Sequence, residues 1–307
     1  MYTCRDARTL RDAVTDFFLP TPATDPYYLE LRDGQREHIQ EARRFIEQMW
    51  QMCGGFLDSD LRRRARSNFS SAFWELYLAY ALYANGVHLV PRSERSPAKS
   101  GPDLLIREPP IWIEAVAPGP GQGADRVPDL LDKPGVHAVP DEQVLLRLRS
   151  AIEEKHERLL AYEKKKWVRP DEPTIVAVGG AGLGLLFGER EVPRIVRVAF
   201  PIGWPQLHLD PATGQVVGQS HQYSPAIRKQ SGEEVSTDLF VTPAYGRISA
   251  LLYSASDALN RPTHPGADLI LVLNPHATAP ITPGWFHFMH EYRAEGDKLY
   301  HRPAGSA

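Results

Sequence analysis

Residues 101–116 read GPDLLIREPPIWIEAV, and this stretch decides the fold. Two short runs with strand-like composition, 103–106 and 111–116, flank a Glu-Pro-Pro turn, which predicts a β-hairpin. If the hairpin is tight, its pairing places Asp103 directly opposite Glu114. Opposed side chains of an antiparallel pair lie on one face of the sheet, roughly 4.5–5.5 Å apart at Cβ. The sequence therefore predicts two adjacent carboxylates at the open end of the hairpin.

Two carboxylates in this position repel each other unless a cation or a shared proton joins them. An oxygen-ligated divalent ion is the simplest solution, because magnesium commonly takes one or two carboxylates together with water and phosphate oxygens. Asp103 and Glu114 are therefore predicted metal ligands. The alternative is a slipped hairpin that leaves both acids in water.

A third carboxylate, Glu75, lies in a strongly apolar stretch, residues 70–85, whose spacing predicts a helix that stops at Gly86. At helical spacing it shares a face with small and apolar residues, so we expect it to be at least half buried. An unpaired buried carboxylate is costly and needs a proton, a partner or a metal. Glu75 is therefore either part of a metal site or half of a structural salt bridge.

A long helix is predicted from about residue 141 to 166, and Lys155 falls within its apolar stripe. One interpretation is a lysine that extends from the rim of the stripe into water. The other is an ammonium group directed at the acidic cluster, where it would position a water nucleophile and stabilise developing phosphate charge. The other stripe positions are Val144, Leu148, Ala151, Ile152, Leu159 and Tyr162.

The order of predicted elements indicates an α/β protein with a mixed central β-sheet flanked by helices. We expect an N-terminal helical region (1–68), a core (69–180), and a β-rich C-terminal extension (181–307) packed on the same domain. A Gly- and Pro-rich loop is expected over 118–140. Further strands are predicted at 87–90, 174–178, 194–200, 207–209, 215–217, 248–253 and 268–273.

A helix with Glu75, a strand opening with Pro102-Asp103 and a second strand with Glu114 together resemble the PD-(D/E)XK nuclease superfamily. The resemblance covers roughly residues 69–180 and implies a restriction-endonuclease-like core. It also implies a magnesium-dependent endonuclease that hydrolyses phosphodiester bonds of nucleic acid, with DNA as the expected substrate. Manganese would be expected to substitute for magnesium.

The chain departs from the family pattern at one position. The family's lysine belongs two residues after the second acid, where this chain has Val116. Some members with this fold carry the lysine on the neighbouring helix, and Lys155 would fill that role. Without such a replacement, the chain would be a catalytically inactive relative that binds nucleic acid or protein.

The resemblance implies a role for each residue of the predicted site. Asp103 and Glu114 would hold one or two metal ions, with the backbone carbonyl of Ala115 as a further ligand. Glu75 would complete or relay to a second ion, and Lys155 would orient the attacking water. Gln143 and Arg147, earlier on the same helix, are weaker candidates for contact with the scissile phosphate.

Composition sets the remaining expectations. A formal net charge of −3 over 307 residues counts mildly against a nucleic-acid partner, although local basic stretches exist. The chain has no apolar run of membrane-spanning length, no secretory signal at its start, and only Cys4 and Cys53 as cysteines. We therefore expect a cytoplasmic protein without a membrane partner. Cutting both strands of a duplex would favour a homodimer.

Two other motifs receive structural interpretations. The glycine cluster 179–184 follows a strand but lacks the acidic residue of a dinucleotide site, so we expect a turn. His287 and His290 have no evident third metal ligand, and aromatic packing explains them better.

Overall fold

The computed structural model describes residues 16–95, 101–129, 135–184 and 192–306. Its helices are α1 (Pro26–Asp33), α2 (Glu37–Cys53), α3 (Leu61–Ala65), α4 (Phe69–Ala84), α5 (Asp141–Lys164) and α6 (Arg194–Ala199). Its strands are β1 (Leu104–Ile106), β2 (Ile111–Val116), β3 (Thr174–Gly179), β4 (Ile202–Leu209), β5 (Val216–Tyr223), β6 (Ala226–Arg228), β7 (Glu234–Ser236), β8 (Ala250–Ser254), β9 (Ile270–Leu273), β10 (His290–Glu295) and β11 (Lys298–Arg302). Cys4 lies outside the described residues.

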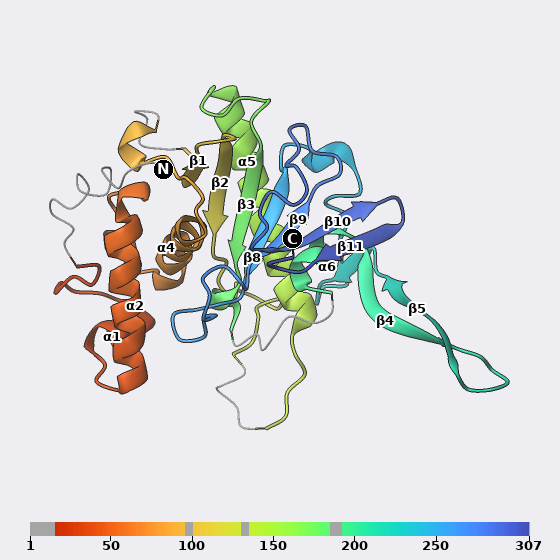
Figure 1. Ribbon diagram of the computed structural model, residues 1–307. Coiled ribbons are helices and arrows are strands. Elements are labelled where there is room, and N and C mark those ends of the chain that lie inside the picture. Colours follow the sequence, from red (N-terminus) through yellow and green to blue (C-terminus); the bar gives the residue numbers. More distant parts are fainter. Residues whose placement is uncertain (1–15, 96–100, 130–134, 185–191, 307) are drawn as a thin grey trace.

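The central element is one mixed sheet with the strand order β1-β2-β3-β8-β9-β10-β11 (Figure 1). The pairs β2/β3, β3/β8 and β9/β10 are parallel, and the pairs β1/β2, β8/β9 and β10/β11 are antiparallel. This confirms the predicted α/β class with a mixed central sheet flanked by helices. The region beyond residue 181 supplies β8 to β11, so the sheet continues from the N-terminal half into the C-terminal part of the chain.

The two faces of the sheet carry different helices. Ile175 and Ala177 of β3 pack into the core formed with α1, α2 and α4, whereas Val176 and Val178 pack into the core formed with α5 and α6. This alternation follows from the two-residue period of a strand, which sends successive side chains to opposite faces. Consequently, a residue's place in β2 or β3 determines which helix layer it meets.

Helix α4 is buried along most of its length, as its nearly continuous apolar sequence predicts. Asn68 caps its start by accepting a hydrogen bond from the Ser71 N–H (3.3 Å). Gly86, at φ +76°, follows its end, and the Val87 N–H donates to the Leu82 carbonyl to close the last turn.

Two predicted strands are wrong. Within the run 194–200, residues 194–199 fold as α6, because the segment buries Ile195, Val196 and Val198 beside α5. Local β-branched composition thus yields to tertiary packing. Residues 87–90 form no strand; Leu89 makes only an isolated antiparallel bridge to Ile106.

Several segments lie outside the central sheet. The two-stranded ribbon β4–β5 projects away from it, and β6–β7 forms a second small hairpin (Figure 1). A turn at residues 210–214 joins β4 to β5. Among the described residues, no helix combines the length and the apolar character needed to cross a bilayer.

Candidate functional site

The β1–β2 hairpin has the register that brings Asp103 and Glu114 together. Leu104 pairs with Ile113, Leu105 with Trp112 and Ile106 with Ile111. Asp103, one residue before β1, therefore lies opposite Glu114. Its Oδ2 accepts a hydrogen bond of 2.7 Å from the backbone N–H of Ala115, which holds the carboxylate beside β2.

Glu114 points into the layer beneath α5. Its strand neighbours Ile113 and Ala115 pack in the core on the α4 side, so strand alternation turns Glu114 to the opposite face. The residue is 2% exposed. Such a buried carboxylate requires partners, and α5 supplies them.

Lys155 is the closest of these partners. Its Nζ lies 2.7 Å from Glu114 Oε1, and both side chains are buried. The apolar residues Val144, Leu148 and Ile152 seat α5 on the sheet, and Lys155 continues their spacing. Lys155 thus points at the acidic pair and does not extend to solvent.

Two further side chains of α5 face the same carboxylates. Arg158 places Nη1 3.7 Å from Glu114 Oε1 while its Nη2 pairs with Glu154 Oε1 at the surface (3.0 Å). Burial, followed by the charges of Glu114 and Asp103, raises the pKa of the Tyr162 hydroxyl. Sequence reasoning missed both as site residues, although their spacing from Lys155, three and seven positions, places them on its face of the helix.

The ionisation of the acidic pair reflects its burial. Burial raises the pKa of Asp103 to about 7, and the negative charge of Glu114 adds to this while Lys155 opposes it. Burial also raises the pKa of Glu114, against the favourable charge and hydrogen bond of Lys155. The two acids therefore sit where a further positive charge would be stabilising.

Glu75 belongs to a different layer. It lies on α4, across the sheet from α5, and both of its oxygens accept hydrogen bonds of 2.8 Å from Arg64. Burial raises the pKa of Glu75 to about 7, Arg64 acts in the opposite direction, and the charge of Asp103 raises it further. The negative charge of Asp103 thus acts on Glu75 across the site. The hydrogen bonds of Glu75 are those of a structural salt bridge with Arg64.

A second arginine positions the start of β1. Arg95 is buried and donates hydrogen bonds to the backbone carbonyls of Pro102 (3.2 Å) and Asp103, and to that of Phe56. These contacts tie the Pro-Asp segment to the helical layer. No sequence pattern identifies Arg64 or Arg95, because each reaches its partner only through the tertiary fold.

The donor set has features that suit one hard metal ion. Glu114 Oε2 is buried and has no hydrogen-bond partner within the described part of the chain, and Asp103 supplies a second carboxylate beside it. Magnesium is commonly held by one or two carboxylates, with water and substrate oxygens completing its shell. In the ranges that the structure describes, no group of three His, Cys, Asp or Glu side chains is arranged around a metal position.

The glycine cluster and the two histidines, for which the sequence predicts structural roles, lie against neighbouring side chains. A Cβ atom at Gly179 would lie 2.7 Å from the Trp74 ring, and one at Gly180 would lie 2.6 Å from the Tyr253 hydroxyl, so both glycines permit close packing. His290 Nδ1 lies 3.1 Å from His301 Nε2, and the His287 ring packs edge-on against Phe288.

Comparisons with known proteins do not identify a family for this chain. No family model, no curated protein and no solved structure matches the chain.

Proposed function

We propose that the protein is a metal-dependent nuclease that hydrolyses phosphodiester bonds of nucleic acid, with DNA as the expected substrate. The observation that carries the proposal is the contact of buried Lys155 with Glu114 (2.7 Å), beside Asp103. Two carboxylates can hold a metal ion for phosphodiester hydrolysis, and an ammonium group beside them can stabilise the charge that develops on the phosphate. A lysine placed on α5 supplies the cation that Val116 cannot.

In this proposal Asp103, Glu114 and the backbone carbonyl of Ala115 would hold one magnesium ion, or manganese in its place. When bound, the ion supplies positive charge that acidifies a water molecule and stabilises charge on the phosphate. Since Arg64 donates hydrogen bonds to both oxygens of Glu75, Glu75 contributes to the fold of the site and is not a ligand of the metal ion in this proposal.

The cationic side chains of α5 have distinct roles. Lys155 orients Glu114 and donates to the attacking water at the position next to Glu114 Oε1. Arg158, with half of its side chain exposed, reaches from the surface to within 3.7 Å of the same oxygen. An arginine in this position can exchange Glu154 for a phosphate, because its planar donors match either anion.

The second candidate is a catalytically inactive binding module of the same fold. The observation that favours it is that Lys155 and Arg64 already neutralise Glu114 and Glu75 within the protein. Such a module would bind nucleic acid or another protein without cutting. A cytoplasmic location suits either function, and the buried free thiol of Cys53 is compatible with a reducing compartment.

The test is plasmid cleavage by the purified protein with Mg²⁺ or Mn²⁺. We expect nicking that EDTA and Glu114→Ala abolish, and that Lys155→Ala lowers by about 10²–10³-fold, the cost of losing one preorganised donor. Glu157→Ala, an exposed position on the same helix, is the matched control and should keep full activity. Linear product from paired nicks would point to a homodimer on duplex DNA.

Calorimetry with Mn²⁺ separates the two candidates. The nuclease predicts Mn²⁺ binding that is lost in Glu114→Ala and retained in Glu157→Ala. Absence of cleavage on DNA and RNA, together with identical Mn²⁺ titrations for both variants, would rule out the nuclease and leave the binding module.

A further inference from the structure

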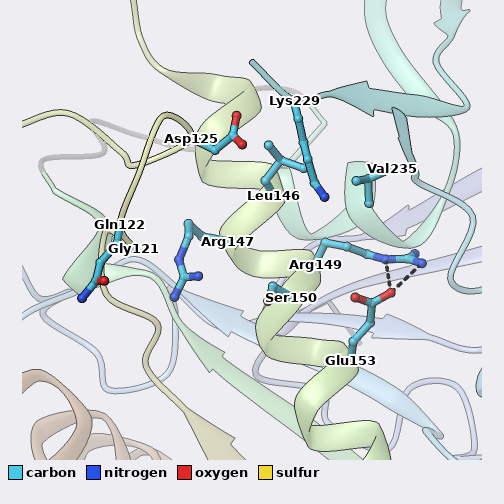
Figure 2. A pocket seen from close by; sticks show the side chains of 10 residues that line it. All are labelled: Gly121, Gln122, Asp125, Leu146, Arg147, Arg149, Ser150, Glu153, Lys229 and Val235. Atoms are coloured by element: carbon cyan, nitrogen blue, oxygen red, sulfur yellow. Dashed lines mark hydrogen bonds and ion pairs between the residues drawn. The ribbon is translucent and has the colours of Figure 1, made fainter. Parts of the chain in front are cut away.

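A pocket of about 250 Å³ lies on the outer side of α5, away from the acidic pair. Its walls come from the loop after β2, from the first half of α5 and from the β6–β7 hairpin (Figure 2). Lys155 and Ser150, which lines the pocket, point about 140° apart on a helix of 3.6 residues per turn. The pocket is therefore separate from the site proposed above.

Arg147 contacts the loop after β2 at one wall of the pocket. Its Nε donates a hydrogen bond of 2.9 Å to the carbonyl of Gly119, and this is its one hydrogen bond within the described part of the chain. Gly121, at φ +84°, lets the loop backbone approach the side chain: a Cβ there would lie 3.0 Å from Arg147 Cδ and 3.1 Å from Nε. The loop thus packs against the arginine stem, and Arg147 lines the pocket together with residues of the loop (Figure 2).

The other charged residues at the pocket already have partners. Glu153 pairs with Arg149 at 3.0 Å and accepts a hydrogen bond from the Tyr245 hydroxyl. Asp125 accepts the Gln230 N–H at 2.7 Å, and Lys229 pairs with Glu233 at 2.9 Å. The lining has three cations and two carboxylates, and Glu233, which pairs with Lys229, adds a third carboxylate beside it. Arg147 is the cation among them that has no carboxylate partner within the described part of the chain, because Gly119 offers it a neutral carbonyl.

We infer that this pocket binds a phosphate group, as inorganic phosphate or as a phosphate monoester about the size of one nucleotide. Arg147 and Ser150 on α5 and Lys229 after β6 line the pocket with side-chain donors from two elements (Figure 2). Donors on separate elements can reach different oxygens of one phosphate group, and an arginine fork is a strong phosphate donor. The volume is below the range of about 300–1,000 Å³ typical of larger organic ligands, which limits the ligand to a small one.

The test is calorimetric titration of the full chain with inorganic phosphate at fixed ionic strength. We expect binding that is at least tenfold weaker in Arg147→Ala and unchanged in Arg228→Ala, whose arginine pairs with Glu234 and does not line the pocket. Gly121→Ala keeps the arginine but displaces its stem, and should weaken binding in the same direction. Equal unfolding midpoints of the variants without phosphate would show that the fold is intact.

Phosphate binding at this pocket does not depend on the nuclease proposal. The phosphate affinity of the Glu114→Ala variant should therefore match that of the wild type. Competition by a 5′-phosphorylated oligonucleotide, and not by the same strand with a 5′-hydroxyl, would assign the pocket to a strand end. Competition by neither would assign it to free phosphate. Absence of phosphate binding by the wild type, or equal affinities for Arg147→Ala and Arg228→Ala, would overturn the inference.

Discussion

At the scale of single residues, buried charges dominate this protein. Lys155 and Glu114 form an ion pair in which each side chain is almost fully removed from water. Removing charges from water costs several kcal/mol per ion, which a close partner offsets only while both members are present. The pair therefore couples α5 to β2. Each member offsets the free-energy cost of burying the other's charge.

Replacing one member of this pair should be strongly destabilising. Lys155→Met leaves Glu114 without its nearest cation, and we expect a loss of about 3–5 kcal/mol in the free energy of unfolding. The double variant Lys155→Met/Glu114→Gln should recover a large part of this loss, because no buried charge remains. Urea denaturation measures both, with exposed Lys164→Met as the control that stays within about 0.5 kcal/mol. A loss below about 1 kcal/mol for Lys155→Met would contradict this account.

His156, one residue further along α5, predicts a pH effect on stability. Burial lowers the pKa of its imidazole, while the charges of Glu157 and Glu153 oppose the shift. Between the lowered pKa and the ordinary value of 6.5, the unfolded chain binds more protons than the native protein. Stability therefore rises with pH through this window and loses that slope above it, by about 1.4 kcal/mol per unit of pKa difference.

The measurement compares wild type with His156→Gln at several pH values. Acidification from about pH 7.5 to about pH 5.5 should destabilise the wild type more than the variant. The raised pKa values of Glu75 and Asp103 act with the opposite sign, but both proteins share them, so the difference isolates His156. Parallel pH curves for the two proteins would show that His156 does not contribute.

At the scale of elements, α4 packs closely against β3 because Gly179 has no side chain. The Trp74 ring lies over Gly179 and its Nε1 donates to the Ala177 carbonyl at 3.0 Å. This contact sets the separation of the helix from the sheet. The same close approach explains the glycine at position 179 without any nucleotide.

Gly179→Ala should push α4 away from the sheet. A Cβ atom 2.7 Å from the Trp74 ring overpacks a site that cannot expand, and we expect a loss of about 1–3 kcal/mol. Gly119→Ala, where a Cβ meets open space, is the matched control and should be nearly neutral. Thermal or urea unfolding provides the comparison, and equal stabilities would mean that Trp74 relaxes without cost.

At the scale of the whole molecule, the sheet joins regions that are far apart in sequence. β3 pairs on one side with β2 and on the other with β8, more than seventy residues later. Leu251 and Val272 then extend the core under α5 and α6. The segment predicted from sequence as the core, residues 69–180, thus depends on later strands to pair with the edge of β3.

A chain that ends at residue 180 should therefore fail to fold cooperatively. It would expose the β3 edge and the apolar residues Val176 and Val178. We expect no sigmoidal urea transition and rapid proteolysis, whereas the full chain should unfold in one transition. A cooperative transition of the fragment would show that the N-terminal half is an independent domain.

The hairpin register and the position of Lys155 were predictable from sequence because both follow from local periodicity. The Glu-Pro-Pro turn fixes which residues pair, and the α5 stripe places Lys155 on the sheet-facing side. The β10–β11 hairpin was equally accessible, since Gly296-Asp297 forms a two-residue loop between paired Glu295 and Lys298.

Other features had no local signature. Strand-like residues 194–200 became α6 because burial beside α5 outweighed their β propensity. The partner of Glu75 depended on α3 bringing Arg64 within 2.8 Å, and the sequence left the metal site and the salt bridge both open for Glu75. Contacts of this kind depend on chain folding over long separations.

By itself, the sequence determined the class of fold, and it predicted the register of the β1–β2 hairpin and the place of Lys155 on the apolar stripe of its helix, because turns and periodic burial are encoded over a few residues. Only the tertiary structure decided that Glu75 lies in the opposite layer, that Arg95 anchors the Pro-Asp segment and that Arg147 faces a pocket. The physical reason is that burial of a charge is settled by whichever distant groups the packed layers bring to it.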